Sequence, residues 1–174
     1  MSAIVAPFPR APREVVGAAR RVGIVALGET KPGAASGDIE NPPLPWEPGT
    51  CPAELRQSIW EWCEAVAGWL NHEYAWRPAH VVPPCWPFHP NIARELAALS
   101  FLHWQAEATA DPQQMEEWNR NVLPLFFNRL INALGPSGCR DGEHVDWPAE
   151  GRYVAYISNE WKTARRDAIG GDTD

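Results

Sequence analysis

The sequence has no long apolar run and no nucleotide-binding loop. No stretch approaches the roughly 18 apolar residues of a membrane-spanning helix. Pro7, Pro9 and Pro12 interrupt the N-terminus where a signal peptide requires a continuous apolar core. The segment Gly28–Gly33 lacks the Gly-Lys-Ser/Thr ending of a phosphate-binding loop. We therefore expect a cytoplasmic protein that does not enter a membrane.

Positive charge is scarce. Acidic residues outnumber basic residues by 22 to 15, which gives a formal net charge of −7. Residues 1–50 carry five charges of each sign, so the whole excess falls after residue 50. A field of this sign repels the phosphates of nucleic acids and of anionic lipids, and we expect neither as a partner. Stacking of single-stranded bases on tryptophans is the alternative, and it would require a positive groove between them.

Tryptophan, in contrast, is abundant. The chain has ten in 174 residues, all between Trp46 and Trp161, where an average composition gives about two or three. An excess of this size serves either a core of large rigid side chains or a surface that holds a partner. Neither use specifies a reaction.

Composition divides the chain at about residue 50. Residues 1–50 contain eight prolines and are predicted to form an extended or disordered arm. Within the arm, Pro42–Pro48 is predicted to be part of a disordered leader, and the alternative is a polyproline helix that lies along a groove, anchored by Leu44 and Trp46. The short apolar run Val22–Leu27 is predicted either to add as a strand or to stay unstructured.

The rest of the chain is predicted to form one domain. Residues 51–168 would be a tryptophan-rich helical domain and residues 169–174 a flexible tail. Residues 71–90 contain five prolines, which exclude a helix or a central strand there. A connection of this length is uncommon unless it packs by its own side chains or binds a partner, and we expect much of it to pack.

Apolar spacing predicts a mainly α fold, a small bundle of three to four helices. The first helix begins near Thr50, and the second runs from Pro90 to about Thr109 with two apolar faces, which is typical of a central helix. Asp111 and Pro112 open the third, which must kink or split at Pro124 because proline lacks the amide hydrogen. A final helix is predicted from about Pro148 to Ala168, with a strand at Tyr153–Ile157 as the alternative.

The order of these features resembles Domain of Unknown Function 4913, an uncharacterised actinobacterial family. The resemblance covers roughly Leu55 to Pro148, and its motifs are Ile59-Trp60-Glu61-Trp62, Trp69-Leu70, Cys85-Trp86, His89-Pro90, Trp104, Trp118, Gly138-Cys139 and His144. Members of this family look like cargo of plasmids, integrative elements and phages. The resemblance therefore implies a genetic setting, and it implies no activity and no site residues.

The cysteines and histidines offer a candidate metal site. Four cysteines permit two disulfides, but in a cytosolic chain with a sizeable core we expect thiols. Cys85 precedes His89 by four residues, and Cys139 precedes His144 by five, spacings that zinc sites accept. The tight Cys-x-x-Cys motif is missing, and Pro87 and Pro90 restrict how the first pair converges. No cofactor is therefore expected, and a structural zinc at these four residues is the alternative.

Two further residues have simple structural interpretations. His103 lies on an apolar helix face, where a buried imidazole is the ordinary explanation. Cys63 lies near a core stripe and is predicted to act as a small apolar residue.

Aromatic side chains on proline-punctuated loops suggest a binding role. Tryptophan contributes strongly to protein interfaces because its large rigid surface loses little entropy when it is desolvated. The candidate partner-binding residues are Trp46, Trp76, Trp86, Phe88 and Trp147. We predict a non-enzymatic accessory or adaptor protein that binds a protein partner through these side chains, with a structural zinc module or a small enzyme as alternatives. The sequence does not specify the oligomeric state.

Overall fold

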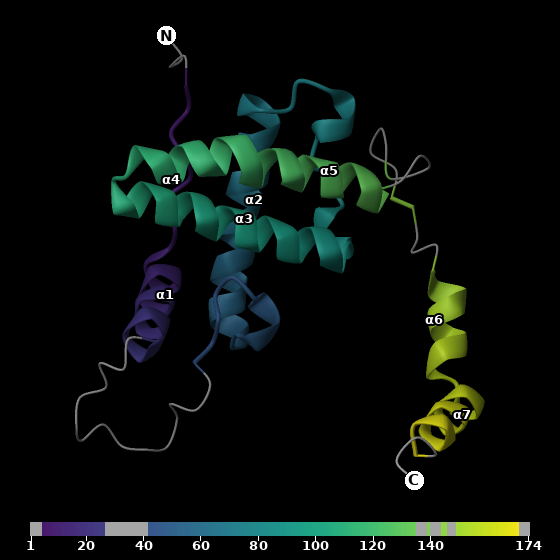
Figure 1. Ribbon diagram of the computed structural model, residues 1–174. Coiled ribbons are helices and arrows are strands. Elements are labelled where there is room, and N and C mark those ends of the chain that lie inside the picture. Colours follow the sequence, from purple (N-terminus) through teal and green to yellow (C-terminus); the bar gives the residue numbers. More distant parts are fainter. Residues whose placement is uncertain (1–4, 27–41, 135–138, 140–143, 146–148, 171–174) are drawn as a thin grey trace, which may run out of the picture. The chain divides into compact units, whose positions relative to one another are not determined.

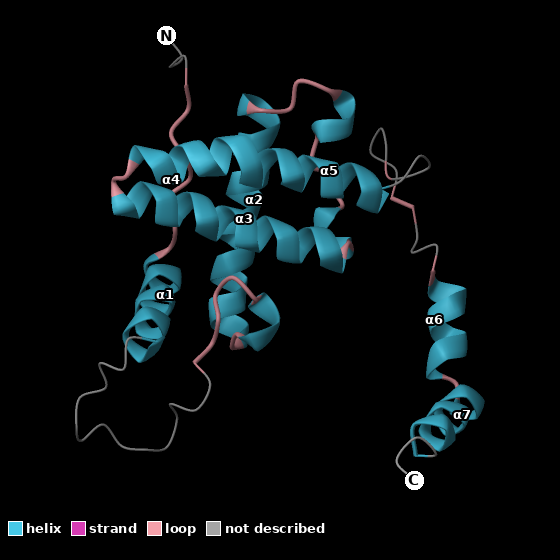
Figure 2. Ribbon diagram, viewed as in Figure 1, coloured by secondary structure: helices cyan, strands magenta, loops and turns pink. Residues whose placement is uncertain are grey.

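The computed structural model is all α (Figure 1). It describes residues 5–26, 42–134, 139, 144–145 and 149–170. No strand occurs within these ranges, as Figure 2 shows. The mainly α fold predicted from apolar spacing is therefore confirmed. Contacts divide the chain into two compact units, residues 1–136 and 137–174, where the sequence predicted one domain over residues 51–168.

The first unit contains two long helices, α2 (Ala53–Glu73) and α3 (Pro90–Thr109). Helix α2 buries one stripe at helical spacing, which includes Ile59, Trp62 and Val66. Helix α3 buries side chains on two faces, among them Leu96 and Phe101, so it is the central helix that the sequence predicted.

The third predicted helix is split, as its proline requires. Asp111 caps α4 (Pro112–Glu117) by accepting a hydrogen bond from the backbone N–H of Gln113 at 2.9 Å. A π-helical turn follows at Trp118–Val122 (η4), and then α5 (Leu123–Leu134). Because Pro124 cannot donate to the helical ladder, the wider turn just before it absorbs the missing bond. Figure 1 shows this α4–α5 rod beside α3.

The N-terminal segment corrects the prediction of an extended arm. Residues 13–26 form helix α1 (Arg13–Ala26), whose last residues include most of the Val22–Leu27 run. Val15 is fully buried and belongs to the hydrophobic core, and Ala18 is buried one turn later. Valine and alanine at helical spacing after Pro12 supply an apolar face, and that signal was outweighed by the prolines on either side.

The segment before α1 is extended and packs on α2. The indole N–H of Trp62 donates to the carbonyl of Pro9, and that of Trp69 donates to the carbonyl of Ala6, each at 2.9 Å. The ring of Phe8 stacks on His103 at 3.7 Å between centroids. Two core tryptophans thus satisfy their polar atoms on this segment, which holds it against the bundle.

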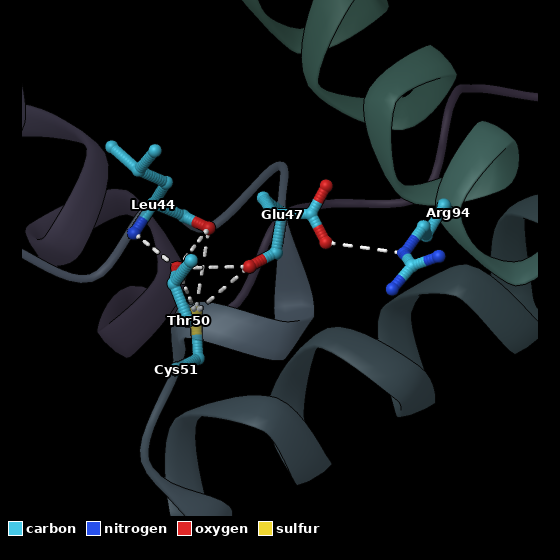
Figure 3. Close-up of polar contacts among 5 residues, drawn as sticks. All are labelled: Leu44, Glu47, Thr50, Cys51 and Arg94. Carbon is cyan, nitrogen blue, oxygen red and sulfur yellow. Dashed lines mark hydrogen bonds and ion pairs between the residues drawn. The ribbon is translucent and has the colours of Figure 1, made fainter. Parts of the chain in front are cut away.

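The segment before α2 is a compact turn, neither the predicted disordered leader nor the alternative polyproline helix. Thr50 Oγ1 accepts a hydrogen bond from the backbone N–H of Leu44 at 2.9 Å and donates to the carbonyl of Glu47 at 2.9 Å (Figure 3). A 3₁₀ turn, η1 (Pro48–Thr50), completes it, and Glu47 pairs with Arg94 on α3 at 3.2 Å. These local bonds favour a turn because the threonine hydroxyl competes for backbone groups that a polyproline helix leaves to water.

The second unit contains α6 (Glu150–Ile157) and α7 (Asn159–Gly170), separated at Ser158. The predicted final helix is therefore broken once, and its Tyr153–Ile157 run is helical. The Arg165 guanidinium donates to the carbonyl of Tyr156 at 2.7 Å and lies 3.8 Å from the centre of its ring. None of the described α6 residues is buried.

Candidate functional site

The predicted partner-binding aromatics do not share one environment. Trp76 is 90 % exposed and Phe88 is 73 % exposed. Trp46 is 38 % exposed, and its ring packs edge-on against Phe101 at 6.0 Å. Trp147 lies outside the described residues.

Trp86, the remaining candidate contact residue, lies in a different environment from Trp76 and Phe88. Its side chain is buried, and its indole N–H donates to Glu64 on α2 at 2.8 Å. The ring of Trp60 lies 6.0 Å from it. Trp86 therefore anchors the connection between α2 and α3 to the bundle instead of facing solvent.

That connection, residues 74–89, is fixed at a second point. The side chain of Asn71 makes two hydrogen bonds to Val82: its Nδ2 donates to the carbonyl at 3.0 Å and its Oδ1 accepts from the N–H at 2.7 Å. Val82 itself is buried. The two 3₁₀ turns η2 (Pro78–His80) and η3 (Trp86–Phe88) use the prolines where no backbone N–H is needed. The loop therefore presents Trp76 and Phe88 from a rigid base.

Cys85 and His89 flank η3. The N–H of Phe88 donates to the carbonyl of Cys85 at 2.9 Å, and the N–H of His89 donates to that of Trp86 at 3.1 Å. These tight turns bring Cys85 Sγ to 3.5 Å from His89 Nε2. The restriction expected from Pro87 does not prevent convergence, because that residue occupies a 3₁₀ turn position compatible with its fixed φ.

Cys139 and His144 form a second pair of the same kind. Cys139 Sγ lies 3.6 Å from His144 Nδ1. The backbone N–H of Val145 also donates to the Cys139 sulfur at 3.2 Å. An N–H directed at sulfur is the kind of outer hydrogen bond that metal-bound cysteines commonly accept.

The four side chains form one group. The sulfur and nitrogen atoms that they would offer a metal ion all lie within 4.8 Å of one another. No other set of three or more His, Cys, Asp or Glu side chains in the described part of the chain has ligand atoms this close. Two thiolates and two imidazoles are a donor set that suits zinc.

The other two cysteines have a different chemistry. Burial raises the pKa of the Cys63 thiol to about 12, and burial likewise raises the pKa of Cys51. Cys51 Sγ donates to the carbonyl of Leu44 at 3.4 Å (Figure 3). Both therefore stay protonated at neutral pH, and the expectation that Cys63 is a small core residue is confirmed. No disulfide joins any of the four cysteines, all of which are described.

His103 is a core histidine, as predicted. It is 5 % exposed, and its neighbours include the rings of Phe8, Trp69 and Trp118. Burial lowers its pKa from 6.5 to about 4, so the ring is neutral at pH 7. Its Nδ1 has no hydrogen-bond partner, and the nearest carboxylate oxygen, on Glu107, is 3.9 Å away.

Sequence reasoning missed the role of the first residues of the chain. Trp62 and Trp69 recur at helical spacing among apolar residues, which indicates burial, and a buried indole N–H needs an acceptor. Proline-rich backbone has carbonyls that no helix uses, so the segment around Pro9 was a natural source of acceptors.

No family model matches the sequence, and neither a curated protein nor a solved structure matches it. No helix in the described ranges combines the length and the apolar character that crossing a bilayer requires.

Proposed function

We propose that this protein is a non-enzymatic adaptor of the cytoplasm that binds a protein partner through the exposed aromatic side chains of residues 74–89. The observation that carries the proposal is the exposure of Trp76, which is 90 % accessible on a loop fixed to the bundle. An exposed tryptophan side chain leaves a large apolar surface in water. A partner that buries this surface gains binding free energy.

The rigidity of the loop favours binding. The double hydrogen bond from Asn71 and the buried ring of Trp86 hold its backbone before any partner arrives. A preorganised surface loses less conformational entropy on association than a mobile one. Phe88, 73 % exposed on the same loop, supplies a second aromatic contact of the same kind.

The bundle and the loop would have separate roles in binding. A bundle of three to four helices is the scaffold, and the proline- and tryptophan-rich loop is its binding element. The setting implied by the family resemblance, an actinobacterial mobile element, rests on the motifs quoted above. The net charge of −7 favours a partner that is not nucleic acid.

Site-specific photo-crosslinking tests the proposal. A benzoylphenylalanine residue at position 76 should give one discrete protein adduct in the cells that encode the chain. Phe88→Ala in the same background should reduce that adduct severalfold. The matched control places the crosslinker at Leu125, which is 53 % exposed on α5. Equal adduct patterns at positions 76 and 125, or no adduct at 76, would refute the proposal.

A further inference from the structure

We propose that Cys85, His89, Cys139 and His144 bind one zinc ion in a tetrahedral site. The ligand atoms would be the two sulfurs, Nε2 of His89 and Nδ1 of His144, which are the ring nitrogens nearest the sulfurs. The proposal does not depend on the adaptor role.

Distances within each pair fit the ion. Zinc–sulfur bonds of about 2.3 Å and zinc–nitrogen bonds of about 2.05 Å, at tetrahedral angles, give a sulfur–nitrogen edge of about 3.6 Å. The observed separations are 3.5 Å for Cys85–His89 and 3.6 Å for Cys139–His144. Each pair therefore already has the spacing of two ligands on one ion.

The distances across the whole group fit as well. The longest edge of such a tetrahedron, between the two sulfurs, is about 3.8 Å. All four ligand atoms lie within 4.8 Å of one another, so shifts of about 1 Å bring them to bonding positions. Side-chain rotation alone supplies movements of that size.

Charge and hydrogen bonding also suit the ion. Two thiolates neutralise the double positive charge, and neutral imidazoles add none, so the occupied site has no net charge. The N–H of Val145, 3.2 Å from the Cys139 sulfur, would serve as the outer hydrogen bond that metal-bound thiolates commonly accept. With four protein ligands the site has no open position, which is the form of structural zinc sites and not of catalytic ones.

An ion held by all four residues would close a loop of chain from Cys85 to His144. Such a closure restricts the unfolded chain, as a disulfide does, and so stabilises the folded state. Because the ion replaces a disulfide in this role, the site works in a reducing compartment.

Metal content tests the proposal directly. The full-length chain, produced with zinc in the medium, should carry one zinc per chain by native mass spectrometry and by elemental analysis. Cys85→Ser and Cys139→Ser should each lower zinc occupancy at least tenfold. The matched control is Cys51→Ser, which changes a buried thiol outside the group and should keep one zinc.

Two further measurements keep the test decisive if a serine variant misfolds. His89→Cys preserves a ligand and should retain the zinc, while circular dichroism checks that the helices are intact. Replacement of zinc by cobalt should give the sulfur charge-transfer band and strong visible bands of a tetrahedral two-thiolate site. A helical wild-type chain without metal, unchanged occupancy in Cys85→Ser, or a Cys85–Cys139 disulfide in the purified protein would overturn the proposal.

Discussion

Apart from exposed rings such as Trp76 and Phe88, the first compact unit of the chain packs most of its aromatic side chains inside, whereas the described aromatic side chains of the second unit are exposed. In the first unit, Trp62, Trp86 and Trp118 are almost completely buried, and the rings pack edge-on and tilted around α2 and α3. In the second, Tyr156 is 58 % exposed and Trp161 is 56 % exposed. The same residue types form a core in one unit and a surface in the other, so tryptophan content alone does not indicate burial.

Different interactions stabilise the two units. Burial of large apolar side chains supplies the free energy of the first unit. The described helices of the second have little buried surface, and the short α6 and α7 are marginal without tertiary packing. The second unit therefore depends on local contacts and, in our proposal, on the zinc ion bound just before α6.

The strongest way to test this comparison is to truncate one tryptophan in each unit. Trp118→Ala should lower the free energy of unfolding by about 3–5 kcal/mol, because it opens a large cavity beside α3. Trp161→Ala on α7 should change it by less than about 0.5 kcal/mol. Urea denaturation of both variants measures the two effects, and similar values would show that the second unit has a core of its own.

A pH titration of stability tests the effect of burying His103 in the first unit. The pKa of His103 is lowered to about 4 when folded, against 6.5 when unfolded, so the unfolded chain binds the extra proton first. The stability that His103 contributes is complete above about pH 6.5 and is lost as the pH falls toward about 4, a loss of at most about 3 kcal/mol.

The control for that titration removes the imidazole. His103→Gln should flatten the dependence of stability on pH in this window, although its absolute stability is lower. Denaturation at several pH values compares the two slopes. Parallel slopes in the wild type and the variant would assign the acid sensitivity to other groups.

The docked N-terminal segment gives a smaller effect. Trp69→Phe keeps an aromatic ring but removes the N–H that donates to the carbonyl of Ala6. Because the Ala6 carbonyl then loses this donor, stability should fall by about 1–3 kcal/mol, and backbone amides around Phe8 should exchange faster with deuterium. Trp104→Phe on α3 is the matched change, and it should leave exchange in residues 5–12 unaltered.

The helices were predictable because their signals are local. Pro90 at the first turn of α3, the Asp111 cap of α4 and the break before Pro124 each follow from the chemistry of one or two residues. Helix α1 was missed because the prolines around it outweighed its short apolar stripe, and the burial of Val15 against distant residues is not visible in the local sequence.

The candidate site was also predictable only where its signals are local. The spacing of each Cys–His pair is visible in the sequence, but the convergence of the two pairs depends on tertiary structure. The burial of Trp86 is not visible there either, because its partner, Glu64, lies one helix earlier. Trp76 and Phe88 belong to the same loop, and nothing in the local sequence distinguishes an anchoring ring from an exposed one.

The smallest effect is expected in the second unit, where Arg165 spans α6 and α7. Arg165→Gln removes the cation over the Tyr156 ring and the bond to the Tyr156 carbonyl, contacts together worth about 0.5–1.5 kcal/mol at a partly exposed site. If the second unit rests on such local contacts, hydrogen exchange should quicken in α6 and α7 while the urea midpoint of the first unit stays unchanged. Lys162→Gln, a matched loss of charge on α7, should leave exchange in both helices as in the wild type. A shift of the global midpoint in Arg165→Gln would instead show that the two units unfold together, and the contrast between a buried and an exposed aromatic set would no longer separate two levels of stability.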